Sequence, residues 1–125
     1  INIVEYLKKN KDIAVRGNIQ AYIIEDGENE KSLLLRGINP RSDFLYEVDV
    51  ETLCDKIIET ARKFKEENNF KAVYLSEQLG SWHALSNREQ VFDYLKERYL
   101  KEKNKKEMSY GITKNTTISH MYRVG

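Results

Sequence analysis

The sequence predicts an α/β (α+β) protein with a mixed central β-sheet flanked by helices. Strand-like apolar runs alternate along the chain with stretches whose apolar residues recur every three or four positions. The clearest helical stretch, residues 49–68, lies between strand-like segments at 32–38 and 72–76, as in a right-handed crossover between parallel strands. With 40% hydrophobic residues and a net charge of +1 over 125 residues, we expect one folded domain at 1–125.

The chain is predicted to begin with a short helix. In residues 2–9, the side chains of Ile3, Val4 and Leu7 share one helical face. A brief apolar run at residues 13–16 indicates a weak strand. Because the first residue is not Met, we expect that the sequence is processed or is a piece of a longer protein that lacks an N-terminal portion.

A pair of strands follows. Residues 18–25 are rich in Ile and alternate in polarity, which is typical of a strand. Asp26 and Gly27 mark a turn, and residues 32–38 return as the next strand. Pro40 ends that strand, because a proline biases the preceding residue away from helix.

The helix at residues 49–68 has Asp49 as its expected N-cap. Its apolar positions follow the spacing of one buried helical face: Val50, Leu53, Cys54, Ile57, Ile58, Ala61 and Phe64. The next apolar run, residues 72–76, is continuous rather than alternating. A continuous run predicts a strand that is covered on both faces.

The last third of the chain predicts one more helix and two strands. Residues 78–86 form a loop, and the spacing of Ser86 and Glu89 indicates a capping box at the start of a helix. Strands are expected at residues 108–113 and 116–124. Without the N-terminal segments the order is β-β-α-β-α-β-β, and ligands favour the place where its two central strands end side by side.

Two loops at that place carry candidate binding residues. The strand exit near Arg36 and Arg41 could hold a phosphate at the start of the long helix, or it could be an ordinary solvated loop. The second loop contains Trp82 and His83, which offer a stacking face and a group that titrates near neutral pH. Equally, Trp82 could fill the core while His83 is solvated.

Other chemistries receive little support. Cys54 lies within an apolar stripe and is predicted to be a small buried residue. An unpaired cysteine also fits the reducing cytoplasm. His83 and His120 have no partner at metal-ligand spacing, so we expect no metal site. No run approaches the roughly 20 apolar residues of a membrane helix, so we expect no membrane partner. The balanced charge argues against a dedicated nucleic-acid binder.

The element order resembles that of the GNAT acyltransferase superfamily. In that family the strands before and after the long helix splay apart, and the pantetheine arm of acyl-CoA lies between them. The spacing of Asn87 and Tyr94 is similar to that of a family Asn, which contacts pantetheine, and a family Tyr, which protonates the departing thiolate. The resemblance implies acetyl-CoA or another acyl-CoA as cofactor, and a small-molecule or peptide amine as acceptor.

By this resemblance the catalytic residues would be Tyr94 as acid and Glu77 or His83 as base. Main-chain donors near Leu75 would hold the oxyanion, and the cofactor contacts would come from Leu75, Arg41, Asn87 and Arg88. The family's glycine motif for pyrophosphate is missing. Residues 44–50 contain no glycine and include Glu47 and Asp49, so the chain would be a divergent member.

Two alternatives stay open at this point. The first is a non-catalytic binding or assembly domain of a larger protein with further domains. The second is a nucleic-acid-processing accessory domain that uses basic and aromatic side chains: Arg36, Arg41, Trp82, Arg88 and the lysines of residues 101–106.

Overall fold

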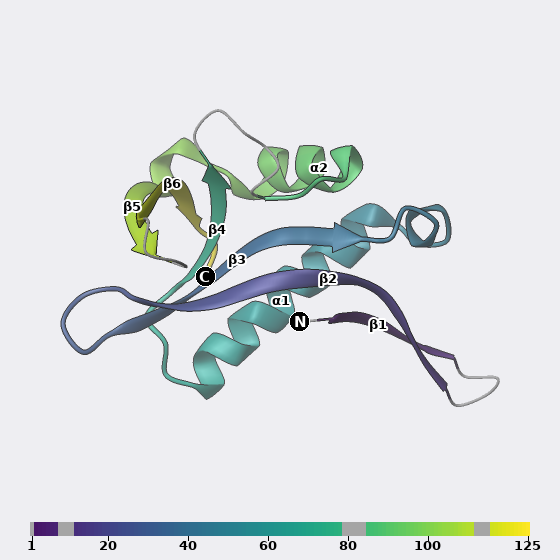
Figure 1. The fold of residues 1–125 in the computed structure, drawn as a ribbon, viewed down its shortest axis with the longest axis horizontal. Helices are drawn as coiled ribbons and strands as arrows, with labels where there is room; N and C mark the ends of the chain where they lie inside the picture. The colour runs from purple at the N-terminus through teal and green to yellow at the C-terminus, as the bar shows by residue number, and fades with distance from the viewer. Residues whose placement is uncertain (1, 8–11, 79–84, 112–115) are drawn as a thin grey trace.

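The computed structural model describes residues 2–7, 12–78, 85–111 and 116–125. The strands are β1 (Asn2–Leu7), β2 (Asp12–Glu25), β3 (Lys31–Pro40), β4 (Val73–Gln78), β5 (Lys105–Gly111) and β6 (Thr116–Arg123). The helices are α1 (Val50–Glu67) and α2 (Glu89–Tyr99), with 3₁₀ turns η1 (Phe44–Tyr46) and η3 (Glu102–Asn104). Figure 1 shows the long β2–β3 pair crossing the molecule, with α1 beside it and the β5–β6 pair at the opposite end from η1.

The described strands form one mixed sheet in the order β1-β2-β3-β4-β6-β5. Only the central pair, β3 and β4, is parallel, and α1 connects these two strands. The other neighbours are antiparallel. The predicted class, the central crossover and the order β-β-α-β-α-β-β are therefore confirmed.

Two sequence predictions are wrong. Residues 2–7 form strand β1 rather than a helix, because they pair antiparallel with the first half of β2. The predicted weak strand and its successor are also continuous, since β2 runs from Asp12 to Glu25. A segment this short fits either periodicity, and the neighbouring strand decides between them.

The prediction of a capping box at Ser86 and Glu89 is also wrong. The N-cap of α2 is Arg88, whose side chain makes no capping hydrogen bond, and Glu89 is the first helical residue. The Ser86 hydroxyl donates a hydrogen bond to the Ile38 carbonyl of β3 instead. At α1 the predicted cap is confirmed, because the Asp49 side chain accepts a hydrogen bond from the main-chain N–H of Thr52 at 3.3 Å.

Both helices pack on the same face of the sheet. Their buried residues share one core with the inward side chains of the central strands: Leu33, Leu35 and Ile38 from β3, Val73 and Leu75 from β4, Cys54, Ile58 and Ala61 from α1, and Val91, Leu95 and Tyr99 from α2. Every residue from Ala72 to Ser76 is buried. The predicted two-sided burial of this strand is therefore confirmed.

The other face is covered by the sheet itself. Leu34, Tyr74 and Met121 form a second buried cluster there, with Tyr22 packed against it. At its edge, Lys106 of β5 reaches back to the turn between β2 and β3, where its ammonium lies 3.1 Å from an Asp26 carboxylate oxygen. Among the described residues, this face is thus closed by contacts between strands and not by a helix.

Asp26 is the polar centre of this face, with only 3% of its surface exposed. Its carboxylate accepts hydrogen bonds at 2.8 Å from the hydroxyls of Ser32 and Tyr74, in addition to the bond from Lys106. Burial alone would raise the pKa of Asp26, but these three donors outweigh it and lower the pKa below its usual value. The buried carboxylate is therefore ionised and fully partnered.

Gly17 allows the end of β3 to cross β2 closely. Its φ is +148°, and a Cβ atom there would lie 2.5 Å from both the Asn39 oxygen and the Pro40 Cα. A side chain at this position would therefore meet backbone that has no room to shift.

We predict that Asp26→Asn lowers the free energy of unfolding by about 1–3 kcal/mol at neutral pH, because it removes the charge that Lys106 and the two hydroxyls bind. The folded-state pKa is below the ordinary 3.8, so this contribution is present above that value and is lost as the pH falls through the folded-state pKa. The free energies of unfolding of the two proteins should therefore converge as the pH falls below about 3.8. The exposed Glu28→Gln in the same turn is the control, and an equal loss in both variants would contradict the prediction.

Gly17→Ala should lower stability by about 2 kcal/mol or more, measured by thermal or denaturant unfolding. Gly27→Ala is the matched control, since Gly27 also has a positive φ of +104° but a Cβ there meets only side-chain atoms, the closest being Glu30 Oε2 at 3.2 Å. If the two variants lose the same stability, backbone conformation alone is responsible and the close crossing is not.

Candidate functional site

The two central strands pair over only three residues each. Leu33, Leu34 and Leu35 of β3 lie beside Val73, Tyr74 and Leu75 of β4. Beyond this point the strands diverge, and Figure 1 shows β4 turning away from β3 towards β6. We call this region the fork, formed by residues 36–40 of β3 and 76–78 of β4. It is the place where the sequence predicts a ligand.

A bulge at Gly37 shapes the β3 side of the fork. Arg36 pairs with Gln20 and Asn39 pairs with Asn18, so Gly37 and Ile38 together lie opposite one residue of β2. Gly37 has a φ of +57°, the left-handed region that glycine adopts without strain. Because of the bulge, the Ile38 N–H has its partner outside β2. It donates to the Leu85 carbonyl at 2.8 Å.

The 85–88 segment occupies this edge of β3. The Ser86 hydroxyl donates to the Ile38 carbonyl at 2.6 Å and accepts from the Arg88 N–H at 3.0 Å. The Asn87 N–H donates to the Asn39 side-chain oxygen at 2.8 Å. Leu85 and Ser86 are both fully buried. The β3 side of the fork is therefore filled by the chain itself.

Arg88 completes this attachment. Its Nε donates to the Pro40 carbonyl at 2.8 Å, so the guanidinium ties the start of α2 to the end of β3. The structure thus brings Asn87 and Arg88, two of the predicted cofactor-binding residues, to the fork. In the structure, however, Arg88 and the Asn87 main chain bind β3.

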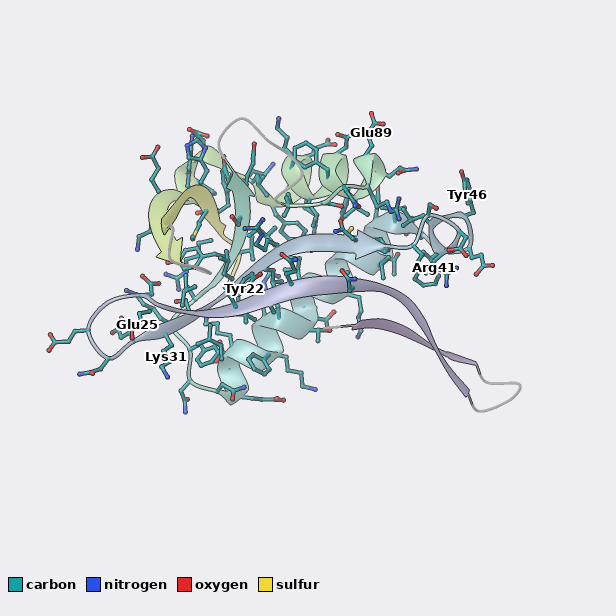
Figure 2. The ribbon with its side chains drawn as sticks, in the orientation of Figure 1. Tyr22, Glu25, Lys31, Arg41, Tyr46 and Glu89 are labelled. Atoms are coloured by element: carbon teal, nitrogen blue, oxygen red, sulfur yellow. The ribbon has the colours of Figure 1, made fainter. Side chains whose placement is uncertain are left out.

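Carboxylates surround the start of α1. Asp43 accepts from Arg41 at 2.9 Å and from the Phe44 N–H at 2.9 Å, and Asp49 caps α1. Figure 2 shows Arg41 and Tyr46 at this end of the molecule, where Tyr46 is 89% exposed. Arg41, the predicted phosphate contact, is thus paired with a carboxylate at the surface.

Tyr94, the predicted acid, faces α1. Its hydroxyl donates to the Asp55 carboxylate at 2.8 Å, and Tyr99 donates to the same oxygen. Tyr99 first, and then Tyr94 and Arg98, lower the pKa of Asp55, in spite of the opposing effect of its burial. Burial and the bond to Asp55 raise the pKa of Tyr94 to about 12. The Tyr94 proton is therefore already held by a carboxylate.

Leu75 and Glu77 lie on β4. Leu75 is fully buried and pairs with Leu35 on one side and Tyr122 on the other. Val73 exchanges main-chain hydrogen bonds with residues 124–125, so the N–H of Leu75, two residues on, points towards β6 and away from the fork. Glu77 lies opposite His120 of β6. His83, the other predicted base, lies outside the described residues, as does Trp82.

Two residues that the sequence did not single out, Asn39 and Asp55, and one that it assigned to a different role, Ser86, hold these groups in place. Asn39 and Ser86 join β3 to the start of α2, and Asp55 binds Tyr94. No local pattern indicated these contacts, because the partners lie 39 to 48 residues apart in the sequence. Cys54 is buried as predicted, and burial, followed by the charges of Asp55 and Asp49, raises the pKa of its thiol to about 12.

Within the described part of the chain, no group of three His, Cys, Asp or Glu residues is placed to hold a metal ion. Neither α1 nor α2, the two α-helices described, combines the length and apolarity needed to cross a membrane. No protein-family model matches the chain, and no curated protein or solved structure matches it either.

Ser86→Ala should lower the free energy of unfolding by about 1–3 kcal/mol, because it leaves the Ile38 carbonyl and the Arg88 N–H without their partner. Hydrogen exchange of the Ile38 amide should accelerate at the same time. The control is Ser42→Ala, at an exposed position of the loop after β3. The 85–88 segment would not be held as described if both variants matched the wild type.

Proposed function

We propose that the chain is a non-catalytic binding or assembly domain with a GNAT-like order of elements, whose fork is closed by its own 85–88 segment. One observation carries the proposal. The main-chain groups of Ile38, which an extended pantetheine arm would need as partners, are bonded to Leu85 and Ser86. A ligand could use this edge only after displacing two buried residues.

The surroundings of the fork support the same function. A pyrophosphate at the start of α1 would meet the carboxylates of Asp43 and Asp49, and it would gain little from a helix N-terminus that is already capped. At α2, the hydroxyl of Tyr94 would have to leave Asp55 before it could protonate a thiolate. The buried thiol of Cys54 fits a reducing compartment such as the cytoplasm.

Acyl transfer from acetyl-CoA to an amine is the second candidate. The divergence of β3 and β4 after Leu35 and Leu75 favours it, since ligands of such sheets bind where parallel strands separate. In an active enzyme the 85–88 segment would leave β3, and Asn87 and Tyr94 would serve the cofactor. Activity that Tyr94→Phe and Asn87→Ala leave unchanged would contradict that use of these residues.

Nucleic-acid processing receives less support. The basic groups that it would use lie far apart, with Arg41 at the η1 end of the molecule and β5 at the other end (Figures 1 and 2). Two of the lysines are also engaged, Lys106 with Asp26 and Lys105 with Glu102. A continuous basic track for a phosphate backbone is therefore not formed by these groups.

Binding of acetyl-CoA distinguishes the first two functions. At 1 mM, a cofactor with a Kd of about 10 µM would stabilise the fold by about 2.7 kcal/mol, which is a shift of several degrees in Tm. We expect no shift in Tm beyond the one that a phosphate-bearing ligand without the pantetheine arm produces, and no change in hydrogen exchange at the Ile38 amide.

The matched control ligand is 3′,5′-ADP, which carries phosphates but lacks the pantetheine arm. A shift that only acetyl-CoA produces, together with altered exchange at Ile38, would overturn the proposed function. A shift that 3′,5′-ADP reproduces, with unchanged exchange at Ile38, reports phosphate binding elsewhere on the protein and agrees with a closed fork.

A further inference from the structure

A basic pocket of about 500 Å³ is lined by residues that lie outside the fork. It is bounded by the C-terminal half of α1, the end of α2, η3 and the end of β6. Five of its lining residues have cationic side chains and none has an acidic side chain: Arg62, Arg98, Lys101, Lys103 and Arg123 line it with Tyr99, Asn104, Val124 and Gly125. The whole chain has a net charge of only +1, so a general excess of basic residues does not explain this concentration.

Some of these cations have structural partners. Arg62 Nε donates to the Val124 carbonyl at 2.6 Å, and Arg98 Nε lies 3.2 Å from Asp55. Arg123 donates to the carbonyls of Gly125 and Lys71 at 3.0 and 3.2 Å. Each of these guanidiniums carries five N–H donors, so one or two such bonds leave others available for a ligand.

Lys101 and Lys103 differ in their surroundings. The Lys101 ammonium donates to the Glu97 carbonyl near the end of α2, where a cation is favoured by the helix dipole. Within the described residues, Lys103 forms no hydrogen bond or ion pair and its side chain is exposed. The helix terminus accounts for Arg98 and Lys101, but not for Arg62, Lys103 and Arg123, which come from other elements.

We propose that this pocket binds a small molecule that carries two or more phosphoryl groups. Its volume lies within the range of small-molecule sites. Arginine forks bind phosphate oxygens in pairs, and a lysine adds a point charge. The like charges would also repel one another less when an anion lies between them.

The aromatic ring in the pocket favours recognition of the phosphates over recognition of a base. The guanidiniums of Arg62 and Arg98 lie 5.9 and 5.5 Å from the centre of the Tyr99 ring. Tyr99 is also 9% exposed. A nucleobase would therefore find no free stacking surface on Tyr99, which a single-stranded nucleic acid uses for binding.

The test is calorimetric titration of the full chain with inorganic pyrophosphate and with ATP, at low and at physiological salt. We expect both to bind, and we expect the double variant Lys101→Gln/Lys103→Gln to raise each Kd about tenfold or more. Lys63→Gln, on the exposed face of α1 beside Arg62 and outside the pocket, should leave both values unchanged. Matching wild-type and variant melting temperatures would show that both variants fold.

Two results would overturn the proposal: no binding of either probe at low salt, or equal weakening by the pocket variant and by Lys63→Gln. A third result would also overturn it and would assign the pocket to nucleic acid. In that case a 12-nucleotide oligomer would bind much more tightly than ATP, and the Lys101→Gln/Lys103→Gln variant would weaken its binding. These outcomes are separate from those of the fork, because pyrophosphate has no pantetheine arm and Ile38 does not line the pocket.

Discussion

Two hydrogen bonds at the main chain of Ile38 determine how the centre of this molecule is arranged. They exist because the bulge at Gly37 leaves the Ile38 N–H and carbonyl to Leu85 and Ser86. The position of α2 depends on them, since Arg88, its N-cap, lies two residues after Ser86 and is tied to Pro40. The packing of α2 on α1, and with it the bonds from Tyr94 and Tyr99 to Asp55, then follows from that start point.

The elements that the sequence predicts correctly are those whose signal is local. The stripe of α1, its Asp49 cap and the continuous apolar run at residues 72–76 need only their own residues to be recognised. Phe64, the last residue of the predicted stripe, is the exception, since it is 41% exposed. The helix prediction for residues 2–7 is wrong because these residues form a strand that pairs with β2, and no local pattern reveals that partner. The prediction of a capping box at Ser86 is wrong for a related reason, because the Ser86 hydroxyl donates to a carbonyl of β3.

The candidate site shows the same division. The sequence places Asn87 and Arg88 at the end of the central strands, and the structure brings them there. What they contact depends on the bulge at Gly37 and on Asn39, neither of which has a distinctive pattern. The grouping of Arg62, Lys103 and Arg123 is equally invisible in the sequence, since these residues are far apart along the chain and meet only when β6 lies beside β4.

The contact between Lys106 and Asp26 joins positions 80 residues apart. During synthesis the turn after β2 emerges long before β5, so Asp26 lacks the Lys106 ammonium while α1, β4 and α2 are made. Pairings between such distant segments are slow to form, because the entropy of closing a long loop is lost before any contact stabilises the pair. Completion of the curved face is therefore a late event in folding, and the last strands of the chain control when the turn between β2 and β3 becomes stable.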